Sequence, residues 1–183
     1  MRTVYLFMMT TIDGYHEGPD HDLSWLPADS DFDEFVLDQN RKTGTAVFGR
    51  RTYELMVDYW TKDAAYDENP AEVVEFMRDV EKVVVSRTLE SVDWNNTRLV
   101  RENPAGELRR LKEGEGGDIA IFGSSNLAGS LLKEGVIDEL RIVTAPVVPG
   151  AGTPLFAGLG EQHGFELTST RTIGKGHVLN VYR

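Results

Sequence analysis

Apolar runs and helically spaced apolar stripes alternate along the 183-residue chain. Strand-like apolar segments, some of the kind found in strands covered on both faces, occur at 3–9, 45–48, 83–85, 97–100, 118–122 and 139–145. Helical spacing occurs between them, at 31–43, 51–59, 71–79, 103–112 and 124–133. Two further strand-like segments flank a Gly-Lys-Gly turn and predict an antiparallel hairpin, at 164–172 and 177–182. The alternation predicts one α/β domain over residues 1–183, with helices flanking a mainly parallel sheet that ends in this hairpin.

Two glycines have a predicted backbone role in the connections. Gly14 follows the first strand and is expected to take a positive φ in the turn. Gly44 is expected to end the first helix. The stretch before that helix is rich in Asp, Gly and Pro and is expected to be a loop. Its polar cluster is expected to be solvated rather than to hold a metal, at His16, Glu17, Asp20, His21 and Asp22.

Charge and composition narrow the choice of partner. The chain has 19 basic and 30 acidic side chains, and its net charge of −11 argues against binding to nucleic acid or to an anionic membrane. The absence of cysteine excludes thiolate metal sites and cysteine nucleophiles. Residues 142–160 are uncharged, but their three prolines rule out a spanning helix, and Met1–Thr10 lacks a signal-peptide pattern. We therefore expect a soluble cytoplasmic protein.

Two predicted strands end in cationic and hydroxylated residues. Arg50, Arg51 and Thr52 begin a helix directly after a strand, where cations oppose the helix dipole unless an anion is bound. Ser86 and Arg87 follow the most apolar strand and suit a dianionic monophosphate such as the 2′-phosphate of NADP. Each segment by itself is also compatible with an ordinary helix start or turn.

A third strand ends in small residues. Gly123 lets the backbone approach a ligand closely at a helix N-terminus, as pyrophosphate binding requires. Ser124 or Ser125 can cap the helix that follows. Because the carboxyl ends of neighbouring parallel strands share one edge of a sheet, the three segments are expected to lie close together. The sequence therefore predicts a nucleotide site at this edge.

Two carboxylates flank the start of the first predicted helix. Asp29 and Asp33 lie near Trp25 and Phe35 in the sequence. Placement at the N-cap and in the first turn explains both carboxylates without a catalytic role, because the positive end of the helix dipole attracts them. The residues themselves leave a structural and a functional reading open.

The motifs in chain order resemble the dihydrofolate reductase-like superfamily. More closely, they are similar to stand-alone proteins related to the C-terminal reductase domain of the riboflavin-biosynthesis protein RibD. The resemblance runs nearly end to end and rests on Thr11-Ile12-Asp13-Gly14, Gly49-Arg50-Arg51-Thr52-Tyr53, Val85-Ser86-Arg87-Thr88, Phe122-Gly123-Ser124-Ser125 with Leu127 and Leu132, Asp138-Glu139-Leu140 and the loop from Pro146 to Phe156. One departure is Gly123-Ser124, where relatives usually have two glycines.

The resemblance implies a three-layer dihydrofolate reductase-like fold and an NADPH cofactor. Arg50 or Arg51, with Ser86 and Arg87, would hold the 2′-phosphate. Thr52 and residues 123–126 would hold the pyrophosphate, and Met9 would meet the nicotinamide carboxamide. The cofactor site implied in full is Met9, Gly49, Arg50, Arg51, Thr52, Val85, Ser86, Arg87, Phe122, Gly123, Ser124, Ser125, Asn126 and Leu127.

The resemblance also implies a substrate site. Asp29 or Asp33 would be the catalytic acid, and Trp25 and Thr144 would contact the substrate. We therefore expect an NADPH-dependent reductase of a small pterin- or pyrimidine-like heterocycle, with a homodimer as a family expectation. Two alternatives are a 5-amino-6-(5-phosphoribosylamino)uracil reductase of riboflavin biosynthesis and a nucleotide-binding module without turnover. No metal is expected.

Overall fold

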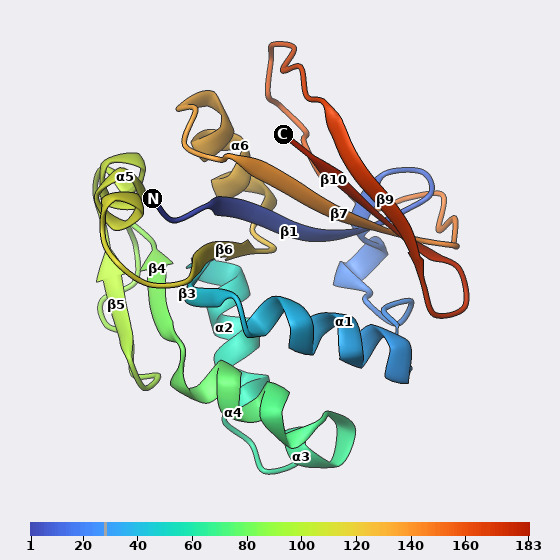
Figure 1. The fold of residues 1–183 in the computed structure, drawn as a ribbon, viewed down its shortest axis with the longest axis horizontal. Coiled ribbons are helices and arrows are strands. Elements are labelled where there is room, and N and C mark those ends of the chain that lie inside the picture. Colours follow the sequence, from blue (N-terminus) through green and yellow to red (C-terminus); the bar gives the residue numbers. More distant parts are fainter. Residues whose placement is uncertain (28) are drawn as a thin grey trace.

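The computed structural model describes residues 1–27 and 29–183. Its main sheet has eight strands in the order β5-β4-β3-β6-β1-β7-β10-β9 (Figure 1). The six parallel strands are β1 (Val4–Thr11), β3 (Thr43–Gly49), β4 (Glu81–Val85), β5 (Thr97–Val100), β6 (Asp118–Phe122) and β7 (Glu139–Ala145). The antiparallel edge consists of β10 (His177–Tyr182) and β9 (Leu167–Ile173). The predicted α/β class, with a mainly parallel sheet and an edge hairpin, is confirmed.

Helices cover both faces of the sheet and complete three layers (Figure 1). One face is covered by α1 (Ser30–Asn40), α2 (Arg50–Trp60) and α4 (Ala71–Asp79), with the short α3 (Ala65–Glu68) beside α4. The other face is covered by α5 (Pro104–Glu113) and α6 (Ser125–Lys133). In the described part of the chain, no helix is long and apolar enough to cross a membrane.

Strand alternation sends neighbouring residues into different apolar layers. Leu6 and Met8 of β1 pack in the cluster formed with α5 and α6, whereas Phe7 and Met9 pack in the cluster formed with α1. The same alternation holds in β7, where Ile142 packs against the α5 and α6 layer and Val143 is buried in the α1 layer. Burial of both faces explains why the parallel strands have continuous apolar sequences.

Gly44 does not end the first helix, contrary to the prediction. The helix α1 ends at Asn40, and Gly44 lies inside β3. A Cβ atom at position 44 would lie 2.8 Å from the backbone nitrogen of Gly117, just before β6. Gly44 is therefore required by the close approach of two backbones. A local pattern cannot distinguish a glycine that ends a helix from one that such a distant contact requires.

The segment after β1 is more ordered than the predicted loop. Gly14 has the expected positive φ of 85°. Beyond it, β2 (Tyr15–Glu17) pairs antiparallel with β8 (Thr153–Pro154), and Pro19–His21 forms a short 3-10 helix. The prediction of a loop was wrong here because the pairing partner of β2 lies far away in the sequence.

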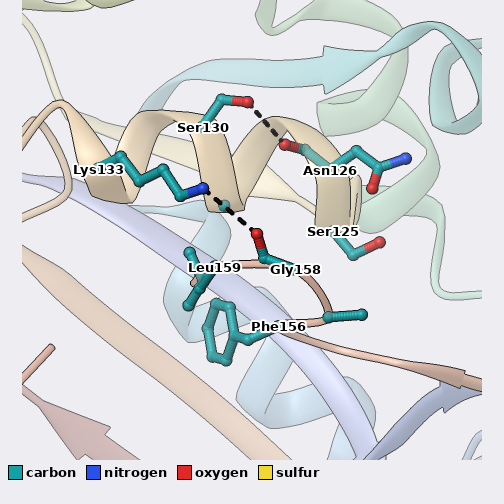
Figure 2. A pocket seen from close by; sticks show the side chains of 9 residues that line it. Ser125, Asn126, Ser130, Lys133, Phe156, Gly158 and Leu159 are labelled. Carbon is teal, nitrogen blue, oxygen red and sulfur yellow. Dashed lines mark hydrogen bonds between the residues drawn. The ribbon is translucent and has the colours of Figure 1, made fainter. Parts of the chain in front are cut away.

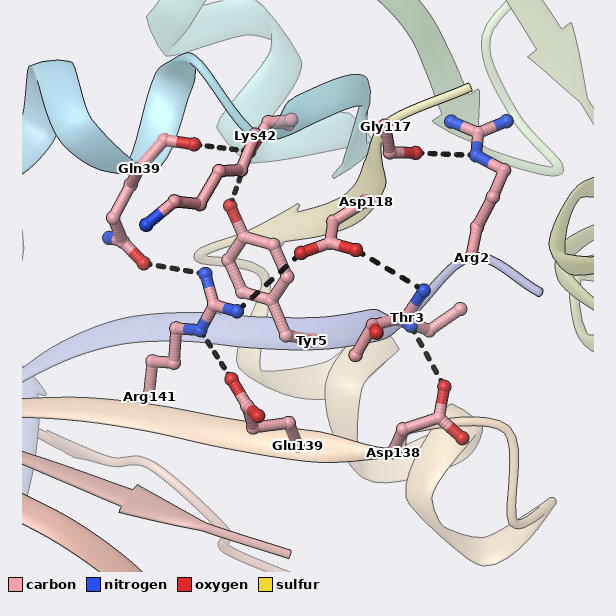
Figure 3. A network of polar contacts seen from close by, with 12 residues as sticks. Arg2, Thr3, Tyr5, Gln39, Lys42, Gly117, Asp118, Asp138, Glu139 and Arg141 are labelled. Atoms are coloured by element: carbon pink, nitrogen blue, oxygen red, sulfur yellow. Dashed lines mark hydrogen bonds and ion pairs between the residues drawn. The ribbon is translucent and has the colours of Figure 1, made fainter. Parts of the chain in front are cut away.

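A buried polar network closes the amino-terminal edge of the sheet (Figure 3). The Arg141 guanidinium lies 3.6 Å from the centroid of the Tyr5 ring and donates to the side-chain oxygen of Gln39 at 2.8 Å. It also pairs with Glu139, whose other oxygen accepts from Arg183 at 2.8 Å. Because the protein's own charges are paired there, the chemistry available to a ligand lies at the opposite, carboxyl edge.

Replacement of Gly44 by alanine is expected to lower the free energy of unfolding by about 1–3 kcal/mol, the usual cost of overpacking. The added methyl group would press on the backbone of Gly117 and force β3 and β6 apart. Urea unfolding of the variant measures this loss. Gly129→Ala is the matched control, because a Cβ in α6 meets only Leu159 at an ordinary 3.6 Å. An equal effect of the two substitutions would contradict the explanation.

Candidate functional site

The topology creates a crevice at the carboxyl ends of the central strands. In the sheet, β6 lies between β3 and β1. After Gly49 the chain continues into α2 on one face, whereas after Phe122 it continues into α6 on the other face. Ligands of open α/β sheets bind at such divergence points. The structure therefore places the segments that begin at Gly49 and at Gly123 side by side, as the sequence predicted.

The hydroxyl of Ser124 joins these two segments. Its Oγ accepts a hydrogen bond from the backbone N–H of Gly49 at 2.7 Å and donates to Oγ1 of Thr52 at 2.7 Å. A Cβ at position 49 would lie only 3.0 Å from this Oγ, so a glycine is needed for the approach. Ser124 occupies the N-cap position of α6 with a φ of 60°, but its side chain does not cap that helix. The prediction of a capping role for its hydroxyl was wrong.

Two helix N-termini consequently meet at this crevice without side-chain caps. Gly49 is the N-cap residue of α2 and Ser124 that of α6, and neither makes a side-chain cap hydrogen bond. The first N–H groups of an uncapped helix lack partners within the helix, and the helix dipole makes this end positive. The pair is suited to the oxygens of a phosphate group or of a pyrophosphate.

The three predicted arginines differ in what they contact. Arg50 pairs with Glu54 on the exposed side of α2 at 3.2 Å, and Arg51 contacts the His21 ring at 2.8 Å. Arg87 is exposed, and no hydrogen bond or ion pair of its guanidinium is recorded within residues 1–27 and 29–183. Arg87 is thus the cation that can reach a ligand without giving up another contact.

Ser86 is committed to the turn that presents Arg87. Its side chain is buried, and its Oγ accepts from the backbone N–H groups of Thr88 at 3.2 Å and Leu89 at 3.1 Å. Val85 precedes it and packs at the margin of the α5 and α6 layer. Because β4 pairs in parallel with β3, residue 85 lies opposite Gly49, and the turn continues along the same edge.

Apolar members of the predicted cofactor site form the floor of the crevice. The Phe122 ring stacks on Phe48, with the centroids 6.0 Å apart, and lies 6.1 Å from the Phe7 centroid in an edge-to-face arrangement. Leu127 packs into the α5 and α6 layer, and Met9 lies on the α1 side of β1. These side chains hold the strand ends in place and leave the polar backbone facing outward.

Ser125 and Asn126 line a cavity of about 230 Å³ between α6 and residues 156–159 (Figure 2). Lys133 closes its far end by donating from Nζ to the backbone oxygen of Gly158 at 3.3 Å. Ser130 donates to the backbone oxygen of Asn126 at 3.1 Å, as Figure 2 shows. Two of the predicted cofactor residues therefore lie on the outer side of α6, next to the N-terminal turn.

The two candidate acids have different surroundings. Asp29 is the N-cap residue of α1 and accepts from the backbone N–H of Phe32 at 3.1 Å, so helix capping alone accounts for this carboxylate. Asp33 lies one turn further, partly buried. Burial raises its pKa above the ordinary value, and the negative charge of Asp29 adds to the rise. Asp33 is therefore the better candidate for a functional carboxyl group.

The two predicted substrate residues do not lie together. Trp25 precedes α1, and its buried indole Nε1 has no hydrogen-bond partner among the described residues. Thr144 is in register with Thr10 of β1 and Val178 of β10. Alternation along β7 places it on the α6 side of the sheet, opposite to α1 and its acids. The structure does not bring Thr144 and Asp33 to one face.

The polar cluster after β1 is largely exposed to solvent, as predicted, with Asp20, His21 and Asp22 on the surface, and its side chains also make specific contacts. Glu17 pairs with His21 at 3.0 Å and accepts from Thr153 of β8 at 2.7 Å. His21 contacts Arg51, which connects the cluster to the start of α2. No group of three metal-ligating side chains occurs among the described residues. The sequence could not reveal this connection because Thr153 is more than a hundred positions away.

A second cavity lies beside this cluster. It has a volume of about 410 Å³ and is lined by residues 18–21 and 151–153. His16 is partly buried nearby, and burial lowers its pKa below the ordinary value despite the charge of Glu17. The pairing of β2 with β8 therefore brings together the two segments that line this second cavity, which reasoning from local pattern missed.

Comparison with known proteins establishes the family. The RibD C-terminal domain family matches residues 2–179, and the chain belongs to this family. The chain is 30% identical over 183 residues to the uncharacterized protein YyaP of Bacillus subtilis (strain 168), covering 99% of this chain and 94% of that protein. The expected resemblance is thereby confirmed.

Solved structures of this kind share the fold. A putative riboflavin biosynthesis protein from Shewanella sp. PV-4 superposes with a TM-score of 0.79 at 21% identity, covering 99% of this chain and 98% of that one. The diaminohydroxyphosphoribosylaminopyrimidine deaminase/5-amino-6-(5-phosphoribosylamino)uracil reductase from Thermotoga maritima gives 0.69 at 15% identity. All of this chain aligns there, with 56% of the Thermotoga chain. The predicted dihydrofolate reductase-like architecture is confirmed.

Replacement of Ser124 by alanine is expected to lower the free energy of unfolding by about 1–2 kcal/mol, because the partly buried N–H of Gly49 loses its acceptor. Alanine has the same backbone preference as serine at a positive φ, so the hydroxyl is the variable that changes. Ser125→Ala, one residue later in α6, is the control for stability. Thermal and urea unfolding compare the two variants. Equal stabilities would mean that the hydroxyl bridge is not a structural link.

Replacement of Asp33 by asparagine is expected to raise the free energy of unfolding at neutral pH. The folded-state pKa of Asp33 lies above its ordinary value of 3.8, so the stability contributed by the protonated group is lost as the pH rises through the folded-state pKa. The asparagine variant avoids this loss. Its advantage over the wild type should grow from about pH 4 upward and disappear in acid.

Urea unfolding at a series of pH values measures this trend. Asp31→Asn is the control, because it removes a carboxylate from the exposed side of the same helical turn. A stability difference for Asp33→Asn that stays constant with pH would contradict the assigned shift in pKa.

Proposed function

We propose that the protein is an NADPH-dependent reductase that transfers a hydride to a small heterocyclic substrate. The observation that carries the proposal is the meeting of two uncapped helix N-termini, held together by Ser124, beside the exposed Arg87 on the next strand. Backbone donors and one accessible guanidinium along a single edge match the successive phosphates of a dinucleotide.

The chain's residues fit the cofactor group by group. The N-termini of α2 and α6, with Thr52 and Ser125, would hold the pyrophosphate. Arg87 would hold the 2′-phosphate, joined by Arg50 once its exposed pair with Glu54 opens. Such an exposed pair on a helix is worth about 0.3–0.5 kcal/mol, so its loss costs little against two new charge-assisted hydrogen bonds. The Gly49 and Gly123 positions allow the backbone to approach the phosphates closely.

The overall charge supports NADP over NAD. The chain has a net charge of −11, yet arginines 50, 51 and 87 lie along one edge of the sheet. The net negative charge of the protein repels anions in general, so arginines gathered at one position indicate that an anion binds there. The extra phosphate of NADP is the group that uses these cations.

The substrate would bind on the α1 side of the same edge. NADPH supplies a hydride when bound, and the protein's part is to hold the substrate against it and to exclude water. Asp33 provides a partly buried carboxyl group for a polar edge of the substrate, while Phe32 and Met9 provide apolar surface. A flat heterocycle with N–H groups suits this combination. The names of the Shewanella and Thermotoga proteins, which refer to riboflavin biosynthesis and to a uracil reductase, favour a pyrimidine-like ring.

A specific observation supports each of two alternative functions. Family membership favours the 5-amino-6-(5-phosphoribosylamino)uracil reductase reaction. The acidic segment from Asp13 to Asp33 would nevertheless repel the phosphate on the ribose of that substrate. A nucleotide-binding module without turnover is favoured by Ser124, which stands where relatives usually have glycine. We also propose a cytoplasmic location and a homodimer. Light scattering after size exclusion measures the molar mass and tests the homodimer.

Replacement of Arg87 by alanine is expected to weaken NADPH binding by about 10- to 100-fold, the value of lost hydrogen bonds to a charged group. Affinity for NADH should stay unchanged, since NADH lacks the 2′-phosphate. Nucleotide fluorescence titration measures both constants. Arg41→Ala is the control, because it removes the same charge from an exposed position at the C-terminal end of α1. Equal wild-type affinities for NADPH and NADH would exclude this assignment.

Turnover separates the proposed reductase from its alternatives. NADPH oxidation is followed with dihydrofolate, with 5-amino-6-ribosylaminouracil and with its 5′-phosphate. Activity on an unphosphorylated ring supports the proposal, whereas a strict need for the phosphate indicates the riboflavin-pathway reaction. Tight NADPH binding without oxidation by any of the three favours the binding module.

A further inference from the structure

His177 is a buried histidine that the cofactor site does not use. It is the first residue of β10, its relative exposure is 8%, and neither ring nitrogen has a hydrogen-bond partner among residues 1–27 and 29–183. An imidazole has at least one N–H donor and, when neutral, one acceptor. Leaving both unpaired in a buried position costs stability, and such a cost is typical of a residue kept for binding.

The face on which His177 lies is set by its pairing. Its cross-strand partner is Ile173 of β9, which packs with Phe35 of α1. Leu179, two residues along β10, belongs to the same α1-side layer. Residues paired across strands, and residues two apart along one strand, point to the same face of a sheet. His177 therefore lies on the α1 side.

The hairpin turn places His177 near the start of α1. A Cβ at Gly174, at the beginning of this turn, would lie 2.7 Å from the Asp29 carboxylate. Asp33 lies one helical turn beyond Asp29, and the charge of Asp29 contributes to its raised pKa. The turn before His177 thus meets the start of α1, the helix that carries Asp33 one turn further on. Because residue 178 pairs with Thr144 near the end of β7, His177 lies at the carboxyl edge on the α1 side of the sheet.

We propose that His177 is a substrate-binding residue, which together with Asp33 recognises the polar edge of a heterocycle with adjacent N–H and C=O groups. This inference rests on the proposed function and goes beyond it, because it assigns the recognition of the ring. One imidazole nitrogen donates to the ring carbonyl, and the Asp33 carboxylate accepts from the neighbouring N–H. A lactam edge, such as that of a pyrimidinone or pterin, offers this pattern, whereas an all-carbon aromatic ring does not.

The pairing also explains a separation of roles between two parts of the carboxyl edge. Arg87 and the helix N-termini select charge, whereas an imidazole and one carboxylate select a hydrogen-bonding pattern. A phosphate-bearing group would find no cation in the Asp33 and His177 pair. The two subsites therefore discriminate between the cofactor and the substrate by different chemistry.

Nitrogen-15 NMR of the four histidine rings tests direct contact. Protein labelled at histidine is saturated with NADP⁺, which cannot reduce a substrate, and is then titrated with dihydrofolate or with 5-amino-6-ribosylaminouracil. The His177 signals are identified by their loss in His177→Phe. They are expected to shift on addition of at least one heterocycle, beyond any shift caused by NADP⁺, while His163 stays unchanged. No response of His177 to either heterocycle overturns the proposal.

Affinity and stability of variants separate binding from structure. His177→Phe keeps the ring shape and removes both nitrogens, so it should weaken binding of the responding heterocycle at least tenfold without lowering Tm. His177→Gln should restore part of the affinity, because its amide can donate. The matched control is His163→Phe, which also removes a buried nitrogen without a hydrogen bond, 3.6 Å from Glu161, and should leave the affinity unchanged. A lower Tm with unchanged heterocycle affinity would assign His177 a structural role instead.

Measuring NADPH binding in the same variants keeps the two proposals apart. His177→Phe should bind NADPH as the wild type does, since β1 and β7 separate β10 from β6 and the proposed phosphate-binding segments. Failure of the wild type to bind NADPH counts against the proposed reductase. If NADPH binding is normal but the affinity for the heterocycle is unchanged in His177→Phe, this result counts against the substrate assignment alone.

Discussion

The position of β6 between β3 and β1 is the constraint on which the site depends. A parallel strand buried in the middle of a sheet must be covered on both faces, so the chain leaves β3 and β6 toward opposite layers. The starts of α2 and α6 therefore meet at one edge without side-chain caps. Gly44 and Gly117 permit the close approach of β3 and β6 at the other end of the same strands.

The two edges of this sheet are built for different purposes. At the amino edge, the half-buried Arg141 and the buried Glu139 are paired with each other and with neighbouring side chains. At the carboxyl edge, Ser124 uses its hydroxyl to join two backbones and leaves its own helix uncapped. Stability is concentrated at one edge, and groups able to bind a ligand are concentrated at the other.

Local sequence patterns predicted the elements well and the connections poorly. The strands 118–122, 139–145 and 177–182 occur as predicted, because burial on both faces or strict alternation gives a clear signal, and the weaker pattern at 97–100 also forms a strand. The failures were Gly44, whose reason is a contact with Gly117, and β2, whose partner lies more than a hundred residues away. In both cases the deciding contact is distant in the sequence, so no local pattern carries it.

The sequence alone determined the fold class, the family and the strand-end segments that we propose bind phosphate, since these depend on residue type and order along the chain. Only the tertiary structure decided what each side chain does. It made Ser86 a turn residue and left Arg87 exposed, and it assigned Asp29 to a helix cap while Asp33 remained partly buried. It also brought His177 beneath the start of α1. The physical reason is that hydrogen-bond partners, burial and the facing of strands are set by pairings between segments far apart in the chain.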